Sequence, residues 1–146
     1  MNYKRDLLEY VKVKIESNIK SIQWIDEYKK KIEKEIENFQ EELNWDGMWS
    51  IGEAIGRLET GWYFNVLEMN DYITGWVWFN SVENILCNLY VNKEFRSKGH
   101  GKQLIYSIMN LAKDDNIDTI YTEVDWWNDS SHITFLRCGW KEYEKD

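Results

Sequence analysis

The 146-residue sequence contains no proline, only two cysteines and two histidines, and no long apolar run. No function follows from the missing proline. Cys87 and Cys138 are too few for a disulfide framework or a four-cysteine zinc site, and we expect both to be reduced core thiols. His100 and His132 lack the pattern of a dedicated metal centre, and we expect both at the surface. No segment approaches the ~18 apolar residues of a membrane span, and no signal-like stretch follows residues 1–6, so we expect a soluble, cytoplasmic protein.

Basic residues are the minority charge, with 18 Lys and Arg against 26 Asp and Glu, so the net charge is −8. A negative field repels phosphate backbones and anionic lipid, which argues against charge-driven binding of nucleic acid or membranes. The same field favours cationic small molecules or basic protein segments, although it also serves solubility alone. A content of 43% hydrophobic and 16% aromatic residues excludes a disordered chain.

The length fits one domain, which we assign to residues 1–146. Its composition changes near residue 43, because Lys, Glu and Ile dominate before this point and Trp, Tyr, Gly and β-branched residues after it. We therefore distinguish an N-terminal strand and helix part, about residues 1–60, from a core part, about residues 61–146.

The first 43 residues fit two patterns. Apolar residues alternate with lysines over residues 11–15, which predicts a strand. An apolar spacing of three or four residues also fits one long amphipathic helix, which we expect from Ser17 onward and which the turn at 44–47 would end. The apolar stripe of this helix would face the domain itself or, alternatively, a second copy in a homodimer, since a similar repeat is a coiled-coil signal.

The rest of the chain alternates between strand and helix patterns. The Asn70-Asp71 pair tolerates the positive φ of a two-residue hairpin turn, and Asn116 can form a left-handed helix cap. This order predicts an α/β (α+β) sheet with helices on its faces. The expected elements are a helix near 50–58, strands at 62–69, 72–79 and 85–91, a helix at 101–113, a strand at 119–124, a helix from Asn128 or Asp129 to Arg137, and an extended end at 141–144.

The most informative stretch, residues 88–102, reads NLYVNKEFRSKGHGK. In it a strand leads into R-x-x-G-x-G, and a helix follows. Gly99 and Gly101 let successive backbone N–H groups point into one concavity, where the helix N-terminus adds its positive dipole end. Arg96, Lys98 and Lys102 add positive charge. The pattern predicts a diphosphate site, although a short Gly-x-Gly before a helix also occurs as a purely local turn.

This stretch resembles the acetyl-CoA motif of the GCN5-related N-acetyltransferase (GNAT) family, which reads hydrophobic-Leu-Tyr-Val, R-x-x-G-x-G and helix. A second family motif, roughly N-x-x-[A/S]-x-x-x-[Y/F]-x-x-x-G-[F/W], is met by Asn128, Ser131, Phe135, Gly139 and Trp140. The resemblance covers about residues 62–143 well and the first 60 residues only by element order. It implies the family's twisted mixed sheet, opened as a V-shaped cleft between two central strands that takes acetyl-CoA.

The resemblance also implies which residues bind this cosubstrate. A backbone N–H near Leu89 should polarise the thioester carbonyl. Asn128 should hydrogen-bond the pantetheine arm or face the thioester. The pantetheine arm should meet backbone groups of Leu89, Tyr90 and Val91. The pyrophosphate should be held, mainly by backbone N–H groups, at Arg96, Ser97, Lys98, Gly99, His100, Gly101 and Lys102.

The implied reaction is direct attack of a primary amine on the thioester in a ternary complex. Glu83, Glu123 and Asp125, at strand ends near the expected acceptor cleft, are the candidate bases. Many family members carry a tyrosine acid at the position of Phe135, which has no proton to give. Either the thiolate, with a pKa near ~8.5, leaves unassisted, or another hydroxyl replaces the tyrosine. The candidates for that hydroxyl are Thr134, Ser131 and Tyr90.

The acidic balance favours a cationic acceptor, such as a polyamine, an aminoglycoside-like amine, or an amine of a basic protein. Trp126 is the aromatic residue best placed in the sequence to contact it. Two alternative functions stay open. The chain could bind acyl-CoA as a sensor or scaffold with weak or no turnover, as Phe135 suggests, or act as an interaction protein through its N-terminal helix.

Overall fold

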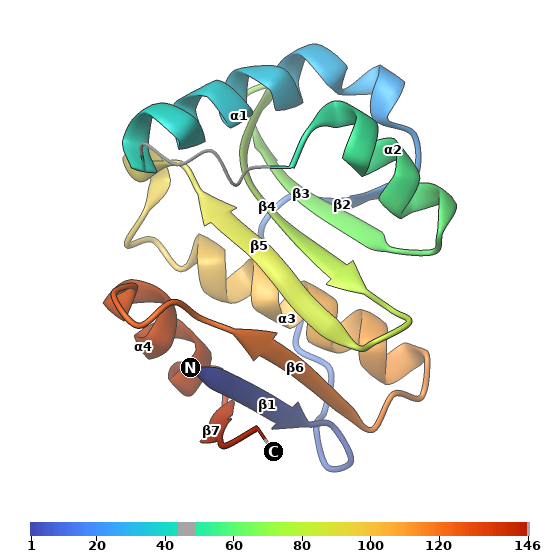
Figure 1. Ribbon diagram of the computed structural model, residues 1–146, viewed down its shortest axis with the longest axis vertical. Coiled ribbons are helices and arrows are strands. Elements are labelled where there is room, and N and C mark those ends of the chain that lie inside the picture. Colours follow the sequence, from blue (N-terminus) through green and yellow to red (C-terminus); the bar gives the residue numbers. More distant parts are fainter. Residues whose placement is uncertain (44–48, 146) are drawn as a thin grey trace.

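The computed structural model describes residues 1–43 and 49–145. A seven-stranded mixed sheet carries helices on both faces (Figure 1). The predicted turn at 44–47, with Trp45, lies outside the described residues. The strands are β1 (Asn2–Asp6), β2 (Ile19–Ile22), β3 (Tyr63–Met69), β4 (Tyr72–Asn80), β5 (Ile85–Val91), β6 (Thr119–Glu123) and β7 (Lys141–Tyr143). The helices are α1 (Lys29–Leu43), α2 (Ile51–Glu59), α3 (His100–Asp114) and α4 (Asp129–Arg137), with 3-10 turns η1 (Ile25–Glu27) and η2 (Lys93–Phe95).

The strands lie in the order β2-β3-β4-β5-β6-β1-β7. β5 and β6 pair in parallel, whereas the other described strand pairs are antiparallel. The helix between β5 and β6, α3, makes the crossover that a parallel pair requires. The sequence prediction of a mixed sheet with helices on its faces is therefore confirmed.

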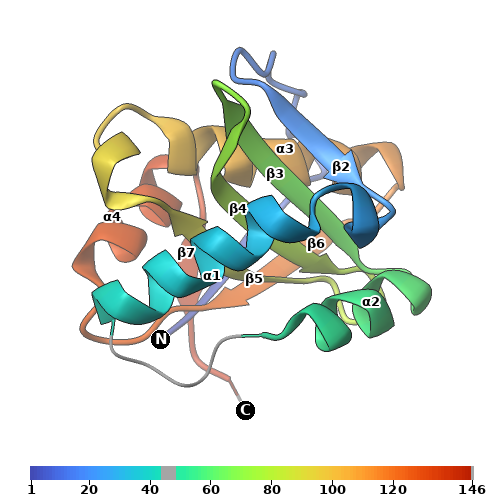
Figure 2. The same ribbon diagram turned by 90° about the horizontal axis from the view of Figure 1, so that it is seen from above.

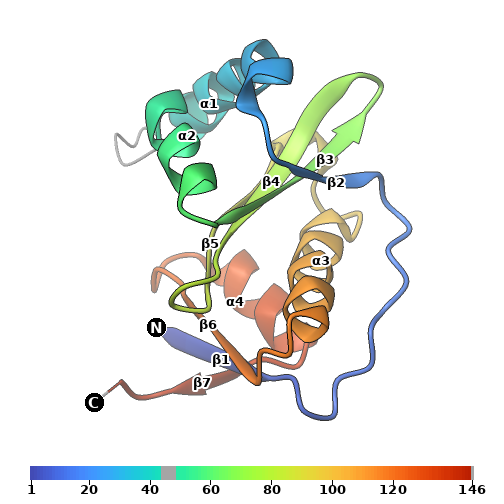
Figure 3. The same cartoon turned by 90° about the vertical axis from the view of Figure 1, so that its right-hand side faces the viewer.

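Two hydrophobic cores lie on opposite faces of the sheet. α1 and α2 cover one face, whereas α3 and α4 cover the other (Figure 3). Residues of β4 alternate between them: Trp76 and Trp78 enter the α1–α2 core, while Val77 and Phe79 enter the α3 core. All four side chains are fully buried. These two tryptophans are thus core residues.

The prediction of a strand over residues 11–15 is wrong. The first strand, β1, pairs with β6 and β7, and residues 7–18 form no strand or helix while they pass along the α3 side (Figure 3). Side chains of α3 bind the backbone there. Asn110 accepts from Val13 N (3.1 Å) and donates to Val13 O (2.7 Å), and Gln103 accepts from Glu16 N (2.8 Å). The segment forms no strand because its backbone is bound by side chains of a helix rather than by a neighbouring strand.

The helix predicted from Ser17 begins at Lys29 instead. Residues 19–22 form β2, an edge strand that pairs with β3. Ile19 and Ile22 lie within β2 and face opposite cores, and Ile25 begins η1, so their spacing of three residues does not come from a helix. α1 itself lies across the sheet (Figure 2), with Ile32 and Phe39 buried against it. The apolar stripe of α1 is therefore covered by the chain's own sheet, which removes the argument for a dimer contact through it.

The predicted turn residues have the expected backbone conformations. Asn70 and Asp71 have φ of 52° and 66°, and Asn116 has φ of 59°. Ile117 N donates to Ala112 O at 3.0 Å, which closes the C-terminus of α3. Within the described residues, none of the helices is long and apolar enough to cross a membrane.

Candidate functional site

The two central strands pair over only two positions. Ile85 stands opposite Tyr121 and Leu86 opposite Thr122, and the Thr122 hydroxyl donates to Leu86 O at 2.7 Å. Beyond this point β6 continues its pairing with β1, while β5 runs away from it (Figure 1). The sheet therefore opens in a V between β5 and β6, as the family resemblance implied.

A β-bulge interrupts β5 just past the point where the strands separate. Trp76 faces Tyr90 and Trp78 faces Cys87, so Asn88 and Leu89 together oppose one residue of β4. Asn88 has φ of 55°, in the left-handed region. A bulge disrupts the regular ladder and re-aims its residues, and it is typical of functional positions. The bulge thus takes the backbone at Asn88 and Leu89 out of the regular ladder with β4.

The loop after β5 forms an open cradle at the N-terminus of α3. Ser97 and Gly99 have φ of 63° and 82°, and Gly99 is the N-cap of this 15-residue helix. No side chain caps the helix, and a Cβ placed on Gly99 would meet no atom within 4 Å. The first amides of α3 are thus available to an anion. The residues fit the diphosphate predicted from the Gly-x-Gly pattern.

The Arg96 side chain is directed toward α1 rather than into this cradle. Its Nε donates to Val91 O at 2.7 Å, and its Nη2 lies 2.6 Å from a carboxylate oxygen of Glu42. Because Glu42 compensates the guanidinium charge, Arg96 holds the loop in place instead of supplying free positive charge. The exposed Lys98 and Lys102 are the remaining cations of the motif.

A second contact from α1 supports the same loop. Asn92 Nδ2 donates to Glu35 Oε2 at 3.1 Å, and Asn38 Nδ2 donates to Glu35 Oε1 at 2.8 Å. Burial raises the pKa of the Glu35 carboxyl, against the lowering effect of these two hydrogen bonds. Sequence analysis missed Glu35 and Glu42 because nothing in a charged helix distinguishes these two from its solvent-exposed glutamates.

Both histidines differ from the expected solvent-exposed side chains. His100 Nδ1 donates to Phe95 O at 3.1 Å and so braces the cradle loop. His132 is buried: Tyr3 OH donates to its Nδ1 at 2.6 Å, and its Nε2 donates to Asp125 O at 2.8 Å. With both ring nitrogens engaged, His132 fastens α4 and the end of β6 to β1.

The second motif lies on α4. The Asn128 side-chain oxygen accepts from Ser131 N at 3.3 Å and caps the helix, so its amide nitrogen remains to donate to a ligand. Phe135 is buried between Tyr3 and Trp140 and presents no hydroxyl. Of the substitute hydroxyls, Tyr90 is buried, and burial followed by the charge of Glu35 raises its pKa far above the usual value.

The structure separates the three candidate bases. Glu83 lies in the turn before β5, at the end where β5 and β6 are paired, and about 13 Å of strand separates Ile85 from Leu89. Glu123 and Asp125 are exposed at and just after the C-terminal end of β6, beyond the two positions where β6 pairs with β5. The geometry therefore favours Glu123 and Asp125 over Glu83.

Both cysteines are free, and burial raises the pKa of each thiol to about 11. Cys87 lies directly before the bulge. A thiol that stays protonated near neutral pH is a poor nucleophile, so an acyl-cysteine intermediate is disfavoured here.

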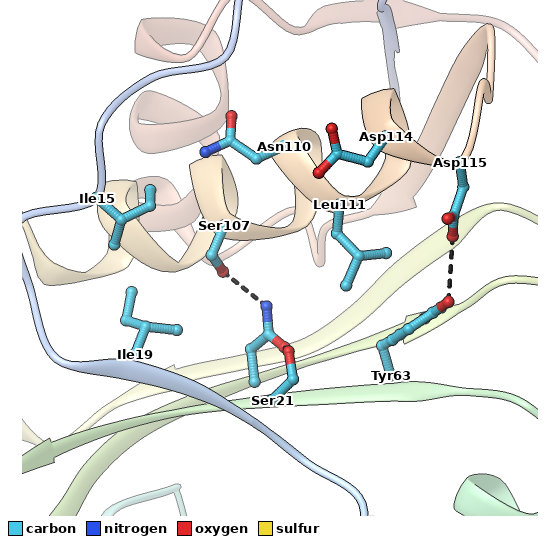
Figure 4. A pocket seen from close by; sticks show the side chains of 10 residues that line it. Ile15, Ile19, Ser21, Tyr63, Ser107, Asn110, Leu111, Asp114 and Asp115 are labelled. Carbon is cyan, nitrogen blue, oxygen red and sulfur yellow. Dashed lines mark hydrogen bonds between the residues drawn. The ribbon is translucent and has the colours of Figure 1, made fainter.

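A separate hollow of about 420 Å³ lies on the α3 side, away from β5 and β6 (Figure 4). Its polar lining is internally hydrogen-bonded: Ser21 Oγ donates to Asn65 Oδ1, and Asn65 Nδ2 donates to Ser107 Oγ at 2.9 Å. At its edge Tyr63 OH donates to Asp115 at 3.1 Å. These bonds join β2, β3 and the C-terminal part of α3 to one another.

Comparison with known proteins identifies the family. The model of the acetyltransferase (GNAT) family matches residues 18–140. The chain therefore belongs to the GNAT family of acetyltransferases. The splayed and bulged central strand and the open cradle at a helix N-terminus agree with this match. The family predicted from the two motifs is therefore confirmed. No curated protein matches the sequence.

Solved structures share the fold at low sequence identity. A GNAT acetyltransferase from Staphylococcus aureus Mu50 is 22% identical, with 87% of each chain covered and a TM-score of 0.70. The PaiA N-acetyltransferase from Thermoplasma acidophilum, in complex with coenzyme A, is 15% identical, with 88% of this chain and 93% of that chain covered and a TM-score of 0.70. AAC(6')-Iy, bound to a bisubstrate analogue of CoA and acetylneamine, is 14% identical, with 88% and 93% covered and a TM-score of 0.68.

Proposed function

We propose that the protein is a cytoplasmic, acetyl-CoA-dependent N-acetyltransferase that acetylates a primary amine in a ternary complex. The observation that carries this proposal is the juxtaposition of the β5 bulge with the open cradle at α3. The first presents backbone groups to an acyl carbonyl, and the second presents helix amides to a diphosphate. A pantetheine arm beside β5 connects the two, as in the family.

The chain's own groups supply most of what the transfer requires. The Leu89 N–H stabilises the oxyanion, an interaction whose loss typically costs ~3 kcal/mol. Asp125 or Glu123 takes a proton from the ammonium, directly or through water, so that the neutral amine nitrogen can bond to the carbonyl carbon. The nitrogen then gives up a second proton to water, and the C–S bond breaks. With Phe135 in the core, CoA leaves as a thiolate without a tyrosine acid, which its pKa near ~8.5 permits.

The acceptor proposed here is a cationic amine, either a small molecule or a basic protein segment. The net charge of −8 supports it, as do the exposed carboxylates and the exposed Trp126 indole at the end of β6. AAC(6')-Iy and a soil-derived neighbour in complex with sisomicin are aminoglycoside acetyltransferases, which is consistent with such an acceptor.

Thiol release tests this function. Purified protein with acetyl-CoA and a panel of polyamines, aminoglycosides and lysine-rich peptides is expected to release CoA only when an acceptor is present. Acetyl-CoA binding without release by any amine would favour the alternative of a sensor, for which the buried Phe135 is the specific observation.

A further inference from the structure

We infer that Arg57 is a positioning residue for acyl transfer, because it clamps Asn88 and thereby fixes the β5 bulge that presents the Leu89 N–H. This inference rests on the proposed function. Arg57 comes from α2, on the opposite side of the site from the Gly-x-Gly cradle, and no motif marks it. Its Nη1 donates to Asn88 Oδ1 at 2.8 Å, the direct side-chain contact between α2 and the bulge.

The clamp acts on a residue that needs support. Asn88 is a non-glycine residue with φ of 55° in the middle of a central strand. Such a conformation is tolerated by asparagine but is uncommon, and it persists where the surroundings fix it. A side-chain hydrogen bond from outside the sheet supplies that constraint here. Losing it would let the bulge relax and turn the following amide.

The clamp itself is rigid. The Arg57 guanidinium lies 4.5 Å from the ring centroid of Trp62 and 5.1 Å from that of Trp78, which is fully buried. No carboxylate in the described part of the chain lies within ion-pair distance of it. Two indole rings and the Asn88 amide therefore orient the Arg57 guanidinium, and no described carboxylate compensates its charge.

The charge also reaches the site. Burial raises the pKa of the adjacent Cys87 thiol to about 11, and the positive charge of Arg57 acts against this rise. The same field acts on the other side of Asn88, where negative charge develops on the thioester oxygen during attack. Fixed positive charge at such a point stabilises the transition state more than the ground state.

Three variants test the clamp. Arg57→Met keeps the side-chain stem and removes both donor and charge, and Asn88→Gly keeps access to positive φ and removes the acceptor. Arg137→Met, at the exposed end of α4, is the matched control. We expect Arg57→Met to lower kcat at least ten-fold, Asn88→Gly to lower it less, and the control to leave it unchanged. The Kd for acetyl-CoA, measured by calorimetry, should stay within about two-fold of wild type in all three.

The double variant makes the test specific. If Arg57 and Asn88 act as a unit, Arg57→Met with Asn88→Gly should lower kcat no further than Arg57→Met alone. The inference alone would be overturned if Arg57→Met had the same kcat as wild type. It would also be overturned if the variant lost kcat and acetyl-CoA affinity by the same factor. A wild type that releases no thiol with any amine would overturn the proposed function, and the inference with it. Should Arg57→Met fail to fold, Arg57→Lys, which keeps the charge but loses the planar guanidinium, must show a smaller loss of kcat with the Kd for acetyl-CoA unchanged.

Discussion

At the scale of single residues, Gly75 shows how closely β4 approaches the strand that carries the bulge. A Cβ placed on Gly75 would lie 2.8 Å from Tyr90 O and 3.2 Å from a methyl carbon of Leu104. Because the first neighbour is backbone, β5 itself would have to move. A glycine is therefore required here by close approach rather than by an unusual φ.

We expect Gly75→Ala to lower the free energy of unfolding by about 1–3 kcal/mol, the range for overpacking a core, and to weaken acetyl-CoA binding. Gly56→Ala is the control: its Cβ would meet nothing within 4 Å, inside helix α2, so it should raise stability by about 0.5–1 kcal/mol. Urea unfolding of both variants checks this. If Gly75→Ala were as stable as Gly56→Ala, the close approach of β4 to β5 would be contradicted.

Glu35 makes stability depend on pH. Burial raises the pKa of its carboxyl above the unfolded-state value, so the folded chain holds this proton more tightly. The resulting stabilisation is complete below the unfolded-state pKa and is lost as pH rises through the folded-state pKa. Glu35→Gln removes this dependence while keeping an acceptor for Asn92.

We therefore expect the unfolding free energy of Glu35→Gln, relative to wild type, to increase as pH rises from 4 toward 8. Denaturant unfolding of both proteins at several pH values measures the difference. If the unfolding free energies of the two proteins changed with pH in the same way, the buried carboxyl would not titrate as proposed.

At the scale of elements, residues 7–18 depend on α3. Asn110 binds Tyr10 OH (2.6 Å), Val13 N (3.1 Å) and Val13 O (2.7 Å). Its single side chain thus replaces the ladder that a strand partner would have provided. The connection from β1 to β2 is fixed through this contact.

Asn110→Ala is expected to lower the free energy of unfolding by about 2–4 kcal/mol, from three hydrogen bonds worth roughly 0.5–1.5 kcal/mol each. The amide of Val13 should exchange faster with solvent in the variant. Asp114→Asn, which removes only the exposed ion pair with Lys12, is the nearby control and should change stability by less than ~1 kcal/mol. Unchanged exchange at Val13 would contradict the anchoring role.

At the scale of the whole molecule, the sequence predicted best what neighbouring residues determine. The Asn70-Asp71 turn, the Asn116 cap and the helix after Gly99 follow from local conformational preferences, and their positions are confirmed. The V and the acetyl-CoA motifs came through the family resemblance. Strand β5 was predicted at its observed bounds because an apolar run between turn signals leaves few alternatives.

The features that sequence analysis missed are contacts between distant residues. Val13 meets Asn110 across 97 positions, so the alternation over residues 11–15 could not reveal a helix partner. His132 is buried by Tyr3, 129 positions away. Arg57 meets Asn88 across 31 positions, with a short arginine-bearing helix as its only sequence context. Each contact depends on the assembled sheet, and none leaves a periodic signal.

The central claim is that acetyl-CoA binds where β5 leaves β6, with its diphosphate at the N-terminus of α3. Calorimetric titration with acetyl-CoA, on wild type and Gly99→Asp, tests it most directly. Gly61→Asp, with a comparable φ of 90° but a place in the α2–β3 turn, controls for backbone strain. We expect wild type and Gly61→Asp to bind one acetyl-CoA per chain and Gly99→Asp to bind none. Equal binding by all three, or no binding by wild type, would contradict the account.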